Sequence, residues 1–164
     1  PRNQYRESYL DVCRDCGILA VRTNPDVWYW TPVAKSGFWR KVFRTADAYL
    51  PFTKPKVIYL QHSKAIDQPL HLPASRLYRP WQPRFSFLNR MKISRIKQEM
   101  TVAAKTGGHY HLWWHPHNFG NYPNQCLAEL QELILHFHEL KKQYGFMSLH
   151  MGELTEYIKR NQSA

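Results

Sequence analysis

Residues 107–120, GGHYHLWWHPHNFG, combine a short run of bulky apolar residues with four histidines, which is the strongest structural signal in the chain. Leu112–Trp114 are typical of a buried strand, which the following proline and glycine end abruptly. In α/β folds, functional sites gather at the carboxyl ends of strands, where His115 and His117 fall. Imidazole has an unperturbed pKa of about 6.5, so it can exchange protons near neutral pH. A single histidine would more often fill space between aromatic residues, but four within nine residues favour a functional site.

Helical and strand patterns alternate along the rest of the chain, which is typical of an α/β fold with a mainly parallel sheet. The predicted helices span residues 7–16, 37–50, 88–105, 125–144 and 154–159, and the predicted strands span residues 18–22, 57–60, 112–114 and 146–150. Apolar residues repeat at helical spacing on two faces, Ile93, Ile96, Met100 and Ala103 on one helix and Leu127, Leu130, Ile134 and Phe137 on another.

The length of 164 residues suits a single domain, in which the proline-rich residues 51–83 form an irregular insertion. Within this insertion, residues 69–76 are a strand or an extended loop. So few parallel strands leave edges unpaired and one face of the sheet poorly covered. We therefore expect residues 1–164 to be the carboxyl-terminal part of a longer α/β domain.

The composition favours an anionic or carbohydrate partner. The formal net charge is +11 and aromatic residues make up 15% of the chain. The chain has no run of about 18 apolar residues, so no transmembrane helix is expected, and no signal peptide is visible. The odd cysteine count favours a reducing compartment, and hence the cytoplasm. Cys13 and Cys16 share one helix face and are expected to pack in the core.

Several short motifs, in order, resemble those of the polysaccharide deacetylases, which are metal-dependent carbohydrate esterases with a distorted (β/α) barrel. Residues 1–5, Pro-Arg-Asn-Gln-Tyr, are similar to the third motif of that family, and residues 10–22 match the helix and strand that follow it. Asp26-Val27-Trp28 lies where the fourth motif, an Asp with a Trp shortly after, would lie. Leu112-Trp113-Trp114-His115 resembles the fifth motif. Residues 72–81 and 115–120 also resemble a subgroup with a longer inserted segment.

This resemblance implies the carboxyl-terminal part of a (β/α) barrel that removes N-acetyl groups from a sugar. The family uses a divalent metal, by preference zinc, which polarises the amide carbonyl and activates water. His115 would protonate the departing amine, with His117 as second choice. Arg2 would orient an upstream catalytic Asp, since a nearby cation lowers the pKa of a carboxylate. The first two motifs, which supply that Asp and the metal ligands, are absent and would lie before Pro1, so this chain itself provides no metal ligand.

The resemblance also implies a substrate wall. Trp113, Trp114 and Trp28 are its candidate members, but adjacent residues of a strand point in opposite directions, so only one of Trp113 and Trp114 can line the pocket. Asp26 is a further substrate-binding candidate, although its position after a proline also suits a turn.

Two alternatives stay open. The first is a non-catalytic module that binds an acidic glycan or a nucleic acid through the basic stretch 76–105 and its interleaved aromatic residues Tyr78, Trp81, Phe85 and Phe87. Nucleic acid is the less favoured ligand, because no nucleic-acid-binding motif is recognisable. The second alternative is a zinc site on His109, His111, His115 and His117, which the break at Pro116 makes geometrically awkward. The sequence does not predict an oligomeric state.

Overall fold

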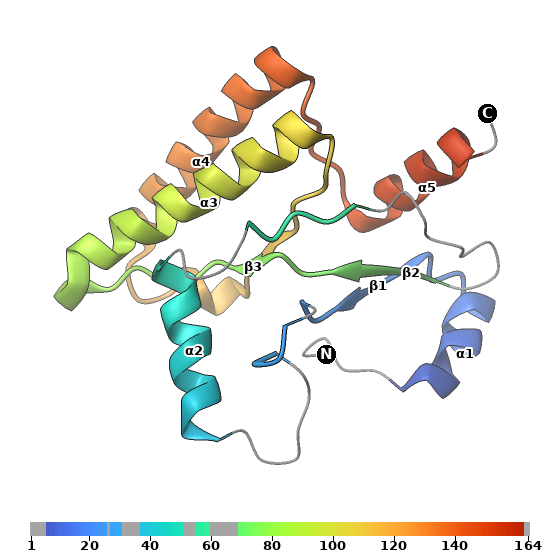
Figure 1. Cartoon of the computed structure of the whole chain (residues 1–164), viewed down its shortest axis with the longest axis horizontal. Helices are drawn as coiled ribbons and strands as arrows, with labels where there is room; N and C mark the ends of the chain where they lie inside the picture. Colours follow the sequence, from blue (N-terminus) through green and yellow to red (C-terminus); the bar gives the residue numbers. More distant parts are fainter. Residues whose placement is uncertain (1–5, 26, 31–36, 51–54, 60–68, 163–164) are drawn as a thin grey trace.

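The computed structural model describes residues 6–25, 27–30, 37–50, 55–59 and 69–162 (Figure 1). These residues form a mixed α/β structure that is mostly helical, with two parallel sheets of two strands each. The prediction of an α/β fold with parallel strands is confirmed. The strands of the described part do not close into a barrel.

The five predicted helices and the predicted strands at residues 18–22 and 112–114 are formed, with boundaries that differ by a few residues. In chain order the elements are a 3₁₀ turn at Glu7–Tyr9, α1 at Leu10–Asp15, β1 at Ala20–Thr23, α2 at Phe38–Tyr49, β2 at Leu70–Pro73, β3 at Arg76–Leu77, a 3₁₀ turn at Pro83–Phe85, α3 at Ser86–Thr106, β4 at Leu112–Trp113, a 3₁₀ turn at Pro116–Phe119, α4 at Pro123–Tyr144 and α5 at Met151–Gln162. Strands β2 and β3 lie inside the insertion that was predicted to be irregular, at the place where the sequence allowed either a strand or an extended loop, residues 69–76. In the described part of the protein, no helix has the length and apolar character needed to cross a bilayer.

Helices α3 and α4 lie side by side and run in the same direction (Figure 1). This direction follows from the chain order, because each helix leaves the carboxyl end of a parallel strand, β3 or β4, and crosses back over the sheet. Both helices end at a glycine in the left-handed region, Gly107 with φ 66° and Gly145 with φ 68°. A side chain would be strained there, so glycine is the residue that allows these two helix ends.

The main core lies between these two helices and the sheet. Its buried members are Tyr78, Ile93, Ile96, Met100, Leu133 and Leu140. The predicted apolar face of α3 is confirmed, since Ile93, Ile96, Met100 and Ala103 are all buried.

The predicted apolar face of α4 is only partly right: Phe137 packs against the core and Leu130 is half-buried, but the other two members point outward. Leu127 and Ile134 are 54% and 46% exposed, whereas Cys126, Leu133 and Leu140 face the core. The buried residues recur every seven positions, which is the spacing of a narrow seam against one neighbouring helix. The wider apolar stripe that the sequence shows is therefore only partly covered.

One extended segment, residues 70–77, belongs to both sheets. Strand β2 pairs in parallel with β1, Ala20 opposite Leu70, and β3 pairs in parallel with β4, Arg76 opposite Leu112. The change of partner occurs at a bulge, where the backbone N–H groups of Ser75 and Arg76 both donate to the His111 carbonyl, at 3.0 and 3.2 Å. All four strands therefore end at the same side of the molecule.

Two predicted strands are not formed. Of residues 57–59, only Ile58 makes a bridge, an antiparallel one to His109. Residues 146–150 connect α4 to α5 without pairing to a strand of the described part, and they line the same apolar groove as Leu112 of β4. Cys13 is half-buried and Cys16 exposed, so the expected core role of this pair is wrong for Cys16.

Candidate functional site

His115 and His117 follow the carboxyl end of β4, as the sequence predicts. A short turn fixes the backbone of His115: its N–H donates to Asn118 Oδ1 at 2.7 Å, and its carbonyl accepts from the Asn118 N–H at 2.9 Å. Proline at the first position of this 3₁₀ turn suits its backbone conformation and lacks the N–H that would be unpaired there. The sequence Pro-His-Asn therefore presents His115 in one backbone orientation.

The His115 ring lies among aromatic rings. It meets Trp113 edge-on, with centroids 5.2 Å apart, and stacks on His117 at 5.0 Å with an interplanar angle of 13°. His115 is half-buried and His117 is exposed. The inner ring is thus sheltered by the outer one, while both remain within reach of a molecule bound at this end of the sheet.

Arg22, from β1, lies over the ring of Trp113, with its guanidinium carbon 4.2 Å from the ring centroid. The same arginine helps to lower the pKa of His111; burial is the larger cause, and a hydrogen bond to the Pro73 carbonyl opposes both. Burial also lowers the pKa of His109, against a hydrogen bond to the Ile58 carbonyl. These two histidines are therefore held neutral near pH 7.

Trp113 and Trp114 point in opposite directions. Trp113 lines a small pocket, whereas Trp114 is 42% exposed and packs edge-on against Phe119. Trp28 contacts Tyr29 and Phe43 and does not line that pocket. The remaining two predicted site residues, Arg2 and Asp26, lie outside the described residues.

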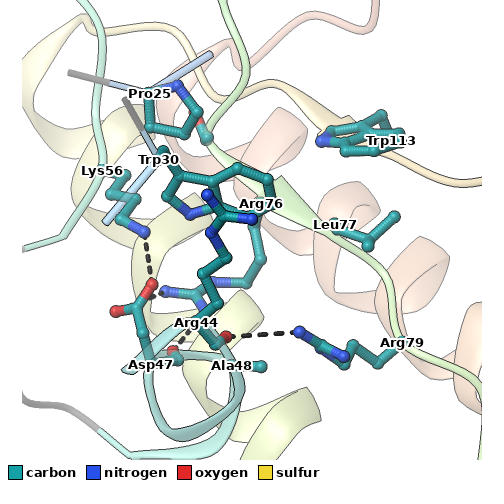
Figure 2. Close-up of a pocket in the computed structure, with 11 residues that line it drawn as sticks. Pro25, Trp30, Arg44, Asp47, Ala48, Lys56, Arg76, Leu77, Arg79 and Trp113 are labelled. Atoms are coloured by element: carbon teal, nitrogen blue, oxygen red, sulfur yellow. Dashed lines mark hydrogen bonds and ion pairs between the residues drawn. The ribbon is translucent and has the colours of Figure 1, made fainter. Parts of the chain in front are cut away.

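The pocket beside Trp113 has a volume of about 20 Å³ and opens near the carboxyl ends of β1 and β3 (Figure 2). A single water needs roughly 10–15 Å³ by the same kind of measure, so the pocket is small but not closed to ligands. Besides Trp113, its lining residues are Pro25, Trp30, Arg44, Asp47, Ala48, Lys56, Ser75, Arg76, Leu77 and Arg79.

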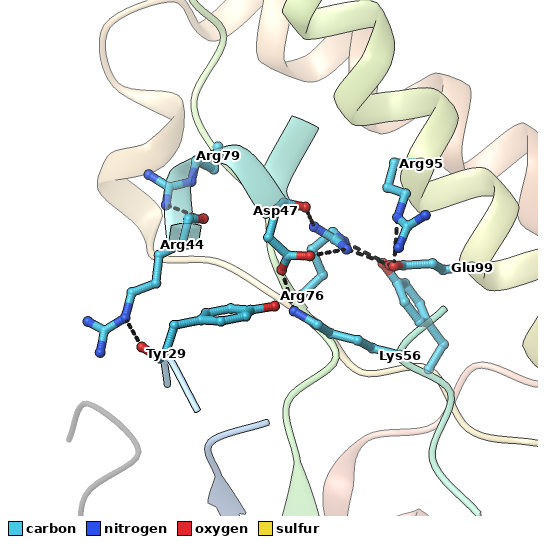
Figure 3. A network of polar contacts seen from close by, with 9 residues as sticks. Tyr29, Arg44, Asp47, Lys56, Arg76, Arg79, Arg95 and Glu99 are labelled. Carbon is cyan, nitrogen blue, oxygen red and sulfur yellow. Dashed lines mark hydrogen bonds and ion pairs between the residues drawn. The ribbon is translucent and has the colours of Figure 1, made fainter. Parts of the chain in front are cut away.

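Behind the pocket lies a buried ionic network centred on Glu99 (Figure 3). The Arg76 guanidinium donates two hydrogen bonds to the Glu99 carboxylate, at 2.8 and 2.7 Å, and a third to the Asp47 carbonyl at 2.6 Å. Arg95 Nε lies 3.1 Å from Glu99, and the Tyr110 hydroxyl donates to the same carboxylate at 2.9 Å. Burial alone would lower the pKa of Arg76, but the hydrogen bonds and charge of Glu99 outweigh it and raise the pKa.

A second network joins α3 to α4. Lys92 lies 2.6 Å from the Glu129 carboxylate and donates to the Arg79 carbonyl at 2.9 Å, and the Tyr78 hydroxyl donates to Glu129. Burial is the main cause of the lowered pKa of Lys92 and the raised pKa of Tyr78. Lys92 therefore acts in the core, as Arg95 does, and these two cations of the basic stretch 76–105 are buried and do not form an exposed binding surface.

The described residues do not fit a metal ion by themselves. Among them, no three His, Cys, Asp or Glu side chains converge to form a possible metal site. Four histidines within residues 109–117 thus give no zinc cluster in the described part. The three cysteines are free.

Sequence reasoning missed Arg22, Arg44, Asp47 and Glu99. Glu99 had a signal, since it is the only acidic residue in α3 and lies four residues after Arg95. The others are brought to the site by contacts between distant segments, for which the local sequence offers no pattern.

Comparison with known proteins does not assign the chain to a family. No family model matches it, and no curated protein or solved structure shows a significant similarity to it.

Proposed function

We propose that this protein is a polysaccharide-deacetylase-like hydrolase that removes N-acetyl groups from a carbohydrate, with His115 as proton donor. The observation that supports the proposal best is the fixed position of His115 after the carboxyl end of parallel strand β4. Its ring contacts Trp113, which lines the adjacent pocket. Active sites in α/β folds are built at this end of the strands.

In the proposed reaction, water adds to the carbonyl carbon of the acetamido group and gives up a proton to the upstream catalytic Asp that the resemblance implies, and the C–N bond then breaks. Protonated His115 transfers its proton to the departing nitrogen, which leaves as a neutral amine, and the acetyl group leaves as acetate. Without this proton the leaving group would be an amide anion, which is too basic to depart near neutral pH. His117, stacked on His115, is the alternative donor.

Other parts of the proposal depend on the family resemblance. They are the wider (β/α) barrel, the role of Arg2 in orienting a catalytic Asp, substrate contacts of Asp26 and Trp28, and a divalent metal, zinc by preference. The ligands of that ion would come from the first two motifs of the family, because the described part of this chain offers no cluster of side chains that could hold it. The three free cysteines are consistent with our further proposal that the protein works in the cytoplasm.

Acetate release from N-acetylated sugar oligomers tests this function. In the full chain, His115→Ala should lower the rate by roughly 10²–10⁴-fold, which is the usual contribution of a general acid. His138→Ala, on the exposed side of α4, is the matched control and should leave the rate unchanged. If acetate release persisted undiminished in both His115→Ala and His117→Ala, the assignment of the acid would be wrong.

The alternative, a module that binds an acidic polymer, has a smaller surface than the sequence suggested. Arg76, Lys92, Arg95 and Tyr78 are buried. An exposed patch remains at the start of α3, formed by Arg84, Phe85, Phe87 and Arg90. If this patch were the functional surface, neutralising both of its arginines would abolish salt-sensitive retention on heparin and leave acetate release unaltered.

A further inference from the structure

The pocket beside Trp113 has an excess of positive charge. Four of its lining side chains are cationic, Arg44, Lys56, Arg76 and Arg79, and one is anionic, Asp47. Two of these cations are already paired: Lys56 with Asp47, and Arg76 with Glu99 behind the pocket. Arg95, which shares Glu99 with Arg76, does not line the pocket.

The excess charge lies on Arg44 and Arg79. Among the described residues, neither is within ion-pair distance of a carboxylate, and both are half-buried. Each donates one hydrogen bond to a backbone carbonyl, Arg44 to Tyr29 and Arg79 to Arg44 at 3.3 Å. A guanidinium has five N–H donors, so most donors of both groups are left for a ligand. Trp30 lies 5.0 Å beneath the Arg44 guanidinium and restricts its position further.

The pocket size selects a chemical group rather than a whole sugar. A volume of about 20 Å³ holds one or two water molecules and cannot enclose a pyranose ring. A carboxylate or phosphate oxygen does fit, and arginine binds both groups through paired N–H donors. The hydrogen bonds to the carbonyl groups of Tyr29 and Arg44 hold the two guanidinium groups in place before a ligand binds. Little side-chain conformational entropy is therefore lost when an anion enters the pocket.

We propose that Arg44 and Arg79 form a subsite for an anionic substituent of the sugar substrate. The inference rests on the proposed function, and Trp113 connects the two. Its ring lines the pocket and lies 5.2 Å from the His115 ring, so a sugar anchored by its charged group in the pocket would extend past Trp113 towards the proton donor. The preferred substrate is then an acidic N-acetyl sugar, with its charge on a phosphate or a carboxylate.

Calorimetric titration with N-acetylglucosamine 6-phosphate and with neutral N-acetylglucosamine tests the subsite without any reaction. The phosphorylated sugar should bind the full chain at least tenfold more tightly. Arg44→Gln and Arg79→Gln should each remove roughly tenfold of that preference, the size expected when a hydrogen bond to a charged group is lost. Arg160→Gln, at an exposed arginine of α5 that does not line the pocket, is the matched control and should change binding less than twofold. Glucuronic acid in place of the phosphate distinguishes a carboxylate from a phosphate ligand.

Arg79→Lys keeps the positive charge but loses the planar guanidinium, so it separates the effect of charge from that of hydrogen-bond geometry. An affinity for the phosphorylated sugar between those of the parent chain and Arg79→Gln supports the subsite. Near-UV circular dichroism must match the parent chain, so that a folding defect is not mistaken for lost binding. Equal affinity for the phosphorylated and neutral sugars would overturn the proposal. The proposal would also be overturned if a single-stranded oligonucleotide bound through the same arginines more tightly than the phosphorylated sugar does. Arginine-dependent phosphate-sugar binding without any acetate release would retain the subsite and reject the proposed function.

Discussion

The Arg76 guanidinium and the Glu99 carboxylate form a buried ion pair with two hydrogen bonds, 2.8 and 2.7 Å long, that joins strand β3 to helix α3. Arg95 and Tyr110 share the same carboxylate. Glu99 therefore supplies the negative charge for two buried guanidinium groups, and the segment that forms the pocket wall depends on it.

Removal of this carboxylate should be strongly destabilising. In Glu99→Ala, buried Arg76 keeps only the Asp47 carboxylate, 4.0 Å away, and buried Arg95 loses its pair with Glu99, so we expect the free energy of unfolding to fall by about 3–5 kcal/mol. Urea denaturation measures the change. Glu132→Ala, which breaks the exposed Lys97–Glu132 pair, is the control and should cost less than about 1 kcal/mol. Equal losses in the two variants would contradict a structural role for the buried network.

Gly108 is packed too closely for a side chain. A Cβ atom at this position would lie 2.2 Å from Val57 Cγ1 and 3.2 Å from Tyr59 Cε1. Because valine is stiff at this torsion, Gly108→Ala should push the 57–59 segment away from His109 and destabilise the protein by about 1–3 kcal/mol in thermal unfolding. At Gly37 a Cβ would meet none of the described residues within 4 Å, so the free energy of unfolding of Gly37→Ala should lie within about 0.5 kcal/mol of the parent. A tolerated Gly108→Ala would mean that the two segments are not in contact.

His111 should make stability depend on pH below neutrality. Its pKa is lowered in the folded protein by burial and by Arg22, so the unfolded chain binds a proton first as the pH falls. The contribution of His111 to the free energy of unfolding is then fully present above about pH 6.5. It decreases as the pH is lowered through that value, by up to roughly 1.4 kcal/mol per pH unit. His111→Gln should flatten this decrease in urea titrations between pH 7.5 and 5. An unchanged slope would show that His111 titrates alike in both states.

Asn118 should act as a positioning residue for His115. Asn118→Ala removes the acceptor for the His115 N–H and should cost about 1 kcal/mol of stability, as loss of a comparable cap does. Under the proposed function, kcat for acetate release should fall while KM stays constant. Asn118→Asp keeps the side-chain acceptor and should restore most of kcat. Failure of the aspartate to restore activity, at equal stability, would argue against this positioning role.

The features predictable from sequence are those set by neighbouring residues. The buried face of α3 and the glycine helix ends follow from local spacing and backbone freedom. So does the position of His115 after a strand. The buried seam of α4 was mispredicted because its apolar stripe is wider than the surface that covers it, and periodicity alone does not tell which half faces α3. Arg22 and Arg44 reach the site through contacts between distant segments, which spacing does not reveal. Arg76 and Lys92 resemble surface cations in sequence, and only their carboxylate partners on distant residues explain their burial.

Two successive backbone amides share the His111 carbonyl as their acceptor. The number of residues between Leu72 and Leu77 therefore determines which side chains of this segment face inward. Side chains alternate sides along an extended segment, so deletion of one residue there would turn Arg76 away from Glu99 and towards solvent, and would bring an uncharged neighbour inward. Evolution or engineering can therefore exchange residue types along this segment far more readily than it can shorten or lengthen it.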